Sequence, residues 1–304
     1  MSLQTAIAPD DVLLRDTPNA REEMQLGNWQ LDTVDGGDVL LDGGACFGVV
    51  PKTVWGKVFE SDDLNRIRLA NNCVLARDGT HTVLIDTGYG GKYAKVDRNA
   101  YGMREGCPVI ESLRELGVER EGVDTVVLGH LHFDHAGGAT QYDAQRNLEI
   151  TFPNANYAIH RFEWEDAISK APELLAAYPQ NNLEPLAESP QLRLLDDNEQ
   201  IVPGLFARRT GGHTRGHTAI VIESGGDAAI YIGDVCPTIQ HIRPLWCLSY
   251  DTFLLTTRRV KQRLLTEAAE KSWWVLWTHD PDSAASRIEM QRDKAMAVEP
   301  MATL

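Results

Sequence analysis

Short apolar runs bounded by turn residues dominate the first third of the chain. Runs of about four to eight β-branched and aliphatic residues between Gly, Asp and Asn are typical of strands. Together these runs predict the first half of a β-sheet structure. The segments are 38–44, 46–50, 67–78 and 82–88, and the last ends in Asp86-Thr87-Gly88.

The next pattern changes from a period of two to a helical one. Residues 108–116 place Val109, Ile110, Leu113 and Leu116 on one helical face, and Gly117 follows as a stop signal. Residues 123–128 then form a β-branched run that ends just before a group of histidines. This order predicts a helix that leads into a strand, with the histidines at the carboxyl end of that strand.

A second set of apolar runs follows a proline-containing polar stretch. A helix is predicted over 253–271, and Trp273–Trp277 is predicted as a strand that leads directly into Thr278-His279-Asp280. Two strand-rich halves of similar size predict an α/β (α+β) fold with two packed sheets and outer helices. The other predicted strands of this part are 154–159, 205–210, 217–224 and 228–234.

Length and composition indicate one large domain. A chain of 304 residues with 43% hydrophobic content can bury a sizeable core. We expect residues 1–30 to form an N-terminal arm and residues 31–304 a catalytic domain. The first thirty residues have no apolar signal-peptide core, and no apolar run approaches the ~20 residues of a membrane span. We therefore expect a soluble, cytoplasmic protein.

Charge and cysteine usage exclude several classes of function. With 29 basic and 44 acidic residues the formal net charge is −15, which argues against nucleic acid and anionic membranes as partners. The five cysteines are scattered and form no CxxC pair, so neither a disulfide framework nor a thiolate zinc site is indicated. Their expected role is apolar packing.

The strongest chemical signal is the run from His130 to His135. His130, His132, Asp134 and His135 lie within six residues, a density of His and Asp that packing alone rarely requires. Two histidines can face one metal ion while the aspartate and third histidine face a neighbouring ion. Gly137 and Gly138 follow and permit a tight backbone path.

Later strand ends offer the ligands that two ions would still need. His213 can complete the first set, Asp234 can bridge both ions through its carboxylate, and His279 can close the second set. A carboxylate that bridges ions ~3.5–4 Å apart is the arrangement of two-metal hydrolases. Nitrogen and oxygen ligands without cysteine suit zinc and leave iron, manganese and cobalt open. The expected cofactors are thus two divalent ions, with Zn²⁺ first.

This pattern resembles the metallo-β-lactamase superfamily and its HxHxDH signature. The resemblance implies a four-layer αββα sandwich, a role for Asp86 in orienting the metal loop, and His213 as the third histidine ligand. His217, in the same GGHTRGH segment, is then expected to support the ligands or the structure. Further similarity in 47–52, 244–246 and 250–251 implies the quorum-quenching N-acyl homoserine lactonase branch, of the YtnP type.

The resemblance has one departure, at Pro237. Well-studied lactonases carry a tyrosine three residues after the bridging aspartate, and this chain has Pro237 there. Tyr250, Thr238 and His241 are the candidates to replace it, and the sequence does not choose between them. Residues expected to bind the apolar part of a substrate are Phe47, Trp55, Trp246 and Tyr250.

The expected function is a dinuclear hydrolase that opens a lactone or a similar carboxylic ester. A hydroxide shared by the two ions would attack the carbonyl carbon, and Asp134 would act as the catalytic proton carrier. Two other enzyme classes remain open: a phosphotriesterase or methyl-parathion-hydrolase-like esterase, and a glyoxalase-type thioesterase. A flavodiiron-type redox protein is disfavoured because His132 stands where that type has glutamate. The expected partner is a small molecule with an apolar part, and the resemblance also implies a homodimer.

Overall fold

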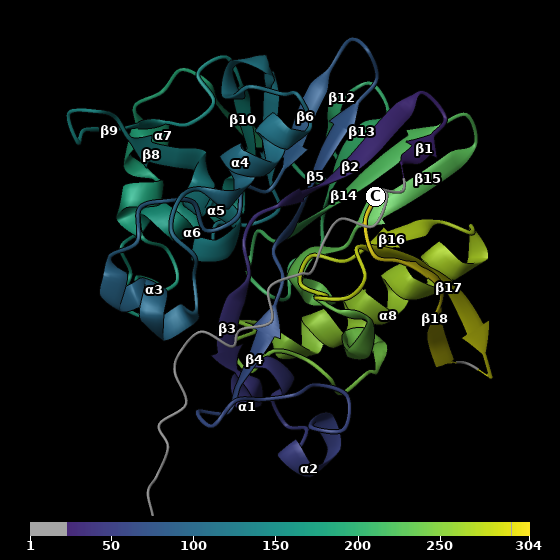
Figure 1. Cartoon of the computed structure of the whole chain (residues 1–304). Helices are drawn as coiled ribbons and strands as arrows, with labels where there is room; N and C mark the ends of the chain where they lie inside the picture. The colour runs from purple at the N-terminus through teal and green to yellow at the C-terminus, as the bar shows by residue number, and fades with distance from the viewer. Residues whose placement is uncertain (1–22, 293) are drawn as a thin grey trace, which may run out of the picture.

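Two seven-stranded sheets form the centre of the molecule in the computed structural model, which describes residues 23–292 and 294–304 (Figure 1). In the first sheet the strands follow the order β1-β2-β5-β6-β7-β10-β11. Their bounds are β1 Met24–Leu26, β2 Trp29–Asp35, β5 Asn72–Arg77, β6 Thr82–Ile85, β7 Thr125–Leu128, β10 Asn156–His160 and β11 Leu192–Leu195.

The second sheet consists of consecutive strands in the order β12 to β18. Like the first, it begins with three antiparallel pairs followed by a parallel one, so the two halves of the chain are built alike. The bounds are β12 Gln200–Val202, β13 Leu205–Arg209, β14 Thr218–Ser224, β15 Asp227–Tyr231, β16 Trp274–Leu276, β17 Ala285–Gln291 and β18 Lys294–Met301.

Two small hairpins and several short helices complete the fold. The hairpins are β3 Val39–Asp42 with β4 Arg66–Leu69, and β8 Thr140–Tyr142 with β9 Leu148–Ile150. The α-helices are α1 Gly43–Phe47, α2 Lys52–Trp55, α3 Lys95–Tyr101, α4 Pro108–Glu115, α5 Phe133–Ala136, α6 Arg161–Ile168, α7 Glu184–Ala187 and α8 Leu254–Glu270. Single 3₁₀ turns are η1 Arg120–Gly122, η2 Gly137–Ala139, η3 Gln180–Asn182, η4 Gly233–Val235 and η5 Ile239–Ile242.

Both faces of each large sheet are buried, which gives four layers. In β5 the side chains of Val74 and Ala76 point into the core between the sheets, whereas Cys73 and Leu75 pack under the helices of the first half. Strand β14 alternates in the same way between that central core and a core beneath α8. Figure 1 shows α4 to α6 on the side of the first sheet and α8 on the side of the second. The expected α/β sandwich with outer helices is confirmed.

Parallel pairing brings the candidate ligand loops to one edge of the sandwich. Strands β6 and β7 are parallel with Ile85 opposite Val127, so the chain leaves both strands at the same sheet edge. Strands β15 and β16 are parallel with Tyr231 opposite Leu276, which places the segments after them side by side in the second sheet. The loops that carry the expected ligands therefore start from neighbouring strand ends.

The structure differs from the sequence prediction at residues 46–50 and at the end of the expected N-terminal arm. Residues 46–50 were expected as a strand, but Gly43–Phe47 is helix α1, because the Asp42 carboxylate accepts the Ala45 N–H at 2.8 Å and caps the turn. Residues 1–22 of the expected arm lie outside the described residues, whereas Met24–Leu26 and the start of β2 belong to the first sheet. Over the described parts of the chain, the helices are too short or too polar to cross a membrane.

Candidate metal centre

The expected metal ligands converge from four segments that are far apart in sequence. Three groups form whose ligand atoms all lie within 4.8 Å of one another, and Asp234 belongs to one of them together with His130 and His135. All the side chains are buried except that of His132, which is partly exposed. The other two groups are the three-histidine group of His130, His132 and His213, and the mixed group of Asp134, His135 and His279.

The Asp234 carboxylate lies between the three-histidine group and the mixed group. Its Oδ1 is 3.1 Å from His279 Nε2 and 3.4 Å from His135 Nε2. Its Oδ2 is 3.5 Å from His213 Nε2 and 4.0 Å from His130 Nε2. Each carboxylate oxygen thus faces a different group, which is the geometry of a bridging ligand.

Hydrogen bonds fix the tautomers of three of these histidines. His279 Nδ1 lies 2.7 Å from the Ala70 carbonyl oxygen, which can only accept, so this nitrogen carries the proton. His135 Nδ1 donates to Asp86 at 2.8 Å, and His213 Nδ1 donates to Asp251 at 2.9 Å. In their neutral form all three rings therefore turn a bare Nε2 lone pair into the site.

Two observations indicate that these residues are suited to bind metal ions. His135 Nε2 and His279 Nε2 face one another at 3.2 Å, and two lone pairs at that distance repel unless a cation binds them. Both ring nitrogens of His130, and Asp234 Oδ1, are buried without a hydrogen-bond partner in the described part of the chain. Buried polar atoms of this kind call for an explanation, and a ligating role provides one.

Charges across the site shift the pKa values of its residues in opposite directions. Burial and neighbouring imidazoles hold the pKa of His130 and His132 well below the ordinary value. Burial also opposes charge on His135, but the Asp234, Asp134 and Asp86 carboxylates outweigh it and hold its pKa well above normal. The Asp234 pKa is well below normal because His279 and His135 outweigh the effect of burial. These directions leave His130 and His132 neutral beside the ionised Asp234 carboxylate, whereas the carboxylates around His135 favour a positive charge at its position.

Asp86 joins the metal loop to the first sheet. Its Oδ1 accepts the Gly129 N–H and its Oδ2 accepts from His135 Nδ1 and from the Tyr231 hydroxyl, each at 2.8 Å. The backbone of Asp86 has a φ of 58°, a left-handed conformation that is uncommon for residues other than glycine. These contacts place Asp86 behind His135 and away from the ligand atoms, and its role in orienting the metal loop stays a prediction.

His217 supports the backbone of Asp234 and belongs to none of the three ligand groups. Burial is the main cause that lowers its pKa to about 3. Its Nε2 accepts the Asp234 N–H at 2.9 Å, so the proton of the neutral ring is on Nδ1, 2.6 Å from Thr210 Oγ1. Both of its nitrogens are thus used within the protein.

Two carboxylates behind the ligands were not assigned a role from the sequence. Asp251 orients His213, and the only sequence hint is its position in a segment similar to lactonases. Glu163 is completely buried in α6 and accepts the Leu131 N–H and the Tyr178 hydroxyl, each at 3.0 Å, as well as the Thr214 hydroxyl. An acidic residue between Phe162 and Trp164 in a short helix was the available signal, since such residues are seldom fully buried.

Three of the four residues expected to bind substrate pack against one another. Phe47 lies 5.3 Å from the rings of both Trp55 and Trp246, and all three side chains are buried. The His241 ring stacks on the Phe47 ring with 5.1 Å between the ring centres, and the Phe59 ring lies 5.3 Å from the Phe47 ring. These residues form an aromatic cluster next to α1 and α2, and substrate contact by them stays a prediction.

Tyr250 differs from the other three because it reaches both solvent and the site. The residue is 41% exposed, and its ring lies 5.8 Å from that of His213. Burial and the charges of Asp234 and Asp134 contribute to a hydroxyl pKa well above normal. By contrast, the hydroxyl of Thr238 and Nδ1 of His241 pair with each other at 2.8 Å, and both residues are buried.

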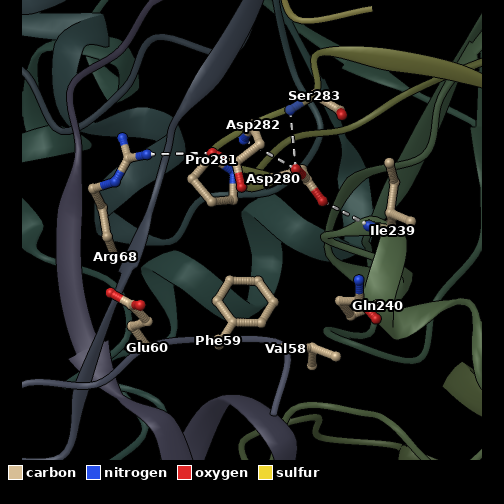
Figure 2. A pocket seen from close by; sticks show the side chains of 10 residues that line it. All are labelled: Val58, Phe59, Glu60, Arg68, Ile239, Gln240, Asp280, Pro281, Asp282 and Ser283. Atoms are coloured by element: carbon tan, nitrogen blue, oxygen red, sulfur yellow. Dashed lines mark hydrogen bonds and ion pairs between the residues drawn. The ribbon is translucent and has the colours of Figure 1, made fainter. Parts of the chain in front are cut away.

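A separate cavity of about 440 Å³ is lined in part by residues 280–283, which directly follow His279 (Figure 2). Asp280 follows His279, and its carboxylate accepts the backbone N–H groups of Ile239, Asp282 and Ser283 at 3.0 to 3.1 Å. None of the seven candidate ligands lines this cavity. Asp280 therefore braces the loop that carries His279 and is not part of the ligand set.

The fold and the ligand geometry agree with the comparison to known families. The model of the metallo-beta-lactamase superfamily matches residues 66–283. This chain belongs to that superfamily. The matched segment contains all the residues of the candidate metal centre.

Solved structures and curated relatives extend the likeness. A probable metal-dependent hydrolase from Staphylococcus aureus superimposes with a TM-score of 0.82 at 30% identity, covering 91% of this chain and 100% of that one. AidC, a dizinc quorum-quenching lactonase solved with the product N-hexanoyl-L-homoserine, has the same fold with a TM-score of 0.74 at 22% identity, covering 92% and 97%. An N-acyl homoserine lactonase from Bacillus sp is 30% identical over 122 residues, which are 40% of this chain and 42% of that protein. The chain spans about half the length of the curated relatives that it matches.

Proposed function

We propose that this protein is a dinuclear-metal hydrolase that opens a lactone ring, with N-acyl homoserine lactones as the first substrates to test. The single observation that carries the hydrolase is the Asp234 carboxylate, whose two oxygens face two different ligand groups. The substrate class is supported by the lactonase among the relatives and by the lactonase among the structural neighbours.

Two divalent ions, with zinc as the expected metal, would be held by residues already in place. His130, His132 and His213 would hold one ion, Asp134, His135 and His279 the other, and Asp234 both. When bound, the ions would supply Lewis acidity and a nucleophilic water at neutral pH.

Asp134 is the proposed proton carrier of the reaction. Its oxygens lie 3.8 Å from His135 Nε2 and 3.7 Å from His279 Nε2, and the residue is 7% exposed. A carboxylate at that position can accept a proton from the attacking water and deliver it to the leaving alkoxide as the ring opens. Asp134 would therefore serve as both a ligand and an acid–base group.

Tyr250 is the proposed contact to a substrate oxygen, in place of the tyrosine that Pro237 replaces. Its ring lies 5.8 Å from that of His213, whereas Thr238 and His241 use their polar atoms on each other. A protonated phenol can donate a hydrogen bond to the carbonyl oxygen as negative charge develops there. The raised hydroxyl pKa keeps Tyr250 protonated and able to donate.

The rim beside Tyr250 offers apolar surface for an acyl chain. The Ser249 N–H donates to the Ala45 carbonyl at 2.8 Å, so the loop that carries Tyr250 is joined to helix α1, which Val49 follows by two residues. Val49 is 66% exposed and Leu245 is 58% exposed. A substrate chain that covered such side chains would gain roughly 25 cal/mol per Å² of buried apolar surface.

Turnover of three substrate classes by the same metal-loaded enzyme tests the proposal. Ring opening releases a proton, so a pH indicator reports hydrolysis of N-acyl homoserine lactones of several chain lengths. An aryl phosphotriester and a glutathione thioester are the comparison substrates. We expect the highest kcat/KM with a lactone. If the phosphotriester or the thioester is hydrolysed and no lactone is opened, the substrate class is wrong.

A further inference from the structure

We propose that Glu163 is a positioning residue that holds the three-histidine group together from behind its ligands. The inference rests on the proposed two-ion site and concerns which ion depends on Glu163. Helix α6, which carries Glu163, contributes no candidate ligand. Glu163 nevertheless lies against both of the segments from which this group is built.

The carboxylate links two segments that are 81 residues apart, counted from His132 to His213. Its Oε1 accepts the N–H of Leu131, the residue between His130 and His132. Its Oε2 accepts the hydroxyl of Thr214, the residue directly after His213. One side chain therefore holds the backbone between His130 and His132 and the side chain of the residue next to His213.

Close packing makes this link short and rigid. Gly216 lies against the first turn of α6, where a Cβ at that position would come within 2.1 Å of the Glu163 nitrogen. The Tyr178 hydroxyl also donates to Oε1, and the Tyr178 ring lies 5.4 Å from that of His132. The segment 213–217 is thus seated directly on the residue that holds it.

Burial makes the link costly to remove. It outweighs the hydrogen bonds from Thr214, Leu131 and Tyr178 and raises the pKa of Glu163. A carboxylate with three donors around it is stable only in that arrangement, because an unpaired buried donor or acceptor costs about 1–3 kcal/mol. The mixed group is held by other atoms, Asp86 behind His135 and the Ala70 carbonyl behind His279.

Metal titration of Glu163 variants tests the proposal without any substrate. Apo-enzyme is titrated with Co²⁺ and with Zn²⁺ against a competing chelator. We expect Glu163→Met to bind one metal ion per protein with wild-type affinity and the second metal ion about 10- to 100-fold more weakly. Glu163→Gln retains the shape and three hydrogen bonds, because its amide can donate to Thr214, and it should restore binding to within a few-fold of wild type. Arg161→Gln, at the start of the same helix and paired with Asp196 outside both linked segments, is the control.

Variants of the candidate ligands show which of the two groups holds the weakly bound metal ion. In a His279→Ala background the remaining tight equivalent belongs to the three-histidine group, and adding Glu163→Met should weaken it. In a His132→Ala background, where the mixed group keeps its full set, adding Glu163→Met should change nothing. Equal weakening in both backgrounds, or wild-type binding of both ions by Glu163→Met, would overturn the proposal.

Two further measurements distinguish misfolding of Glu163→Met from a specific loss of metal affinity. Near-UV circular dichroism reports whether Glu163→Met retains native packing. If it does not, Thr214→Val decides, because it removes one donor to the carboxylate and should weaken the same equivalent. A wild-type enzyme that bound fewer than two ions would contradict the proposed function itself. An enzyme that bound two ions but opened no lactone would leave the Glu163 test intact.

Discussion

The backbone N–H of Asp234 donates a hydrogen bond of 2.9 Å to Nε2 of His217. Gly233, the residue before Asp234, has a φ of 62°, and a Cβ at this position would come within 2.5 Å of His217 Nε2. The glycine therefore allows the imidazole to reach the backbone of the residue that faces both ligand groups.

Replacing His217 should loosen Asp234 without removing a metal ligand. In His217→Ala the Asp234 N–H loses its buried acceptor, which should lower the free energy of unfolding by about 1–3 kcal/mol. Metal affinity should fall about 10- to 100-fold, as is typical when a residue that orients ligands is lost. Urea denaturation and chelator competition measure the two effects. Unchanged metal affinity would show that the hydrogen bond does not position Asp234.

Asp134→Asn separates metal binding from proton transfer. The amide oxygen can still ligate, so metal should remain at least partly bound. The amide cannot accept a proton, so kcat should fall by about 10²- to 10⁴-fold. Metal content by elemental analysis and lactone turnover should be measured on the same sample. A fully active Asp134→Asn enzyme at wild-type metal content would rule out Asp134 as the proton carrier.

Tyr250→Phe removes only the hydroxyl proposed to contact the substrate. The residue as a whole is 41% exposed but its hydroxyl is buried, so thermal unfolding is measured beside turnover to show that the fold is retained. The kcat should fall by about 10²-fold if the hydroxyl stabilises developing charge, with a smaller change in KM. Thr238→Val serves as the comparison, since its hydroxyl is bound to His241. A larger loss of kcat in Thr238→Val than in Tyr250→Phe would reverse the assignment.

The sequence was most informative where chemistry and strand ends coincide. His130 to His135 follow β7, Asp234 follows β15 and His279 follows β16, as the sequence predicted, and the parallel strand pairs bring these strand ends to one edge of the sandwich. The density of His and Asp at that edge then indicated metal, because such side chains are costly to bury unpaired. The sequence also proposed Asp234 as the bridging residue, and the structure adds that its two oxygens face two different ligand groups.

Contacts that depend on distant packing could not be predicted. Residues 46–50 have strand propensity, yet the Asp42 cap and the Trp55 ring packed against Gly43 favour helix α1. The role of Glu163 depends on two segments that meet only in the folded chain. Aromatic residues such as Phe47 suit a pocket or a core equally well, and the structure places Phe47 in a buried cluster.

His241 should make the protein less stable in mild acid. Burial is the main cause that lowers its pKa to about 3, while an unfolded histidine titrates near 6.5. Between these values the unfolded state binds more protons than the folded state, so the free energy of unfolding falls as the pH falls. The contribution is constant above about pH 6.5 and is lost progressively toward pH 3. From pH 7 to pH 5 the loss from this residue alone should be about 2 kcal/mol.

His241→Gln isolates that contribution. Its amide can still donate to the Cys46 carbonyl, which His241 Nε2 reaches at 2.9 Å, and can accept from Thr238, but it does not titrate. The variant should be less stable at pH 7, because the stacking on Phe47 is weaker. Its loss of unfolding free energy between pH 7 and pH 5 should nevertheless be about 2 kcal/mol smaller than that of the wild type. Urea denaturation of both proteins at the two pH values, with equal metal content, measures the difference. Parallel pH dependence in the two proteins would mean that folding does not lower the pKa of His241.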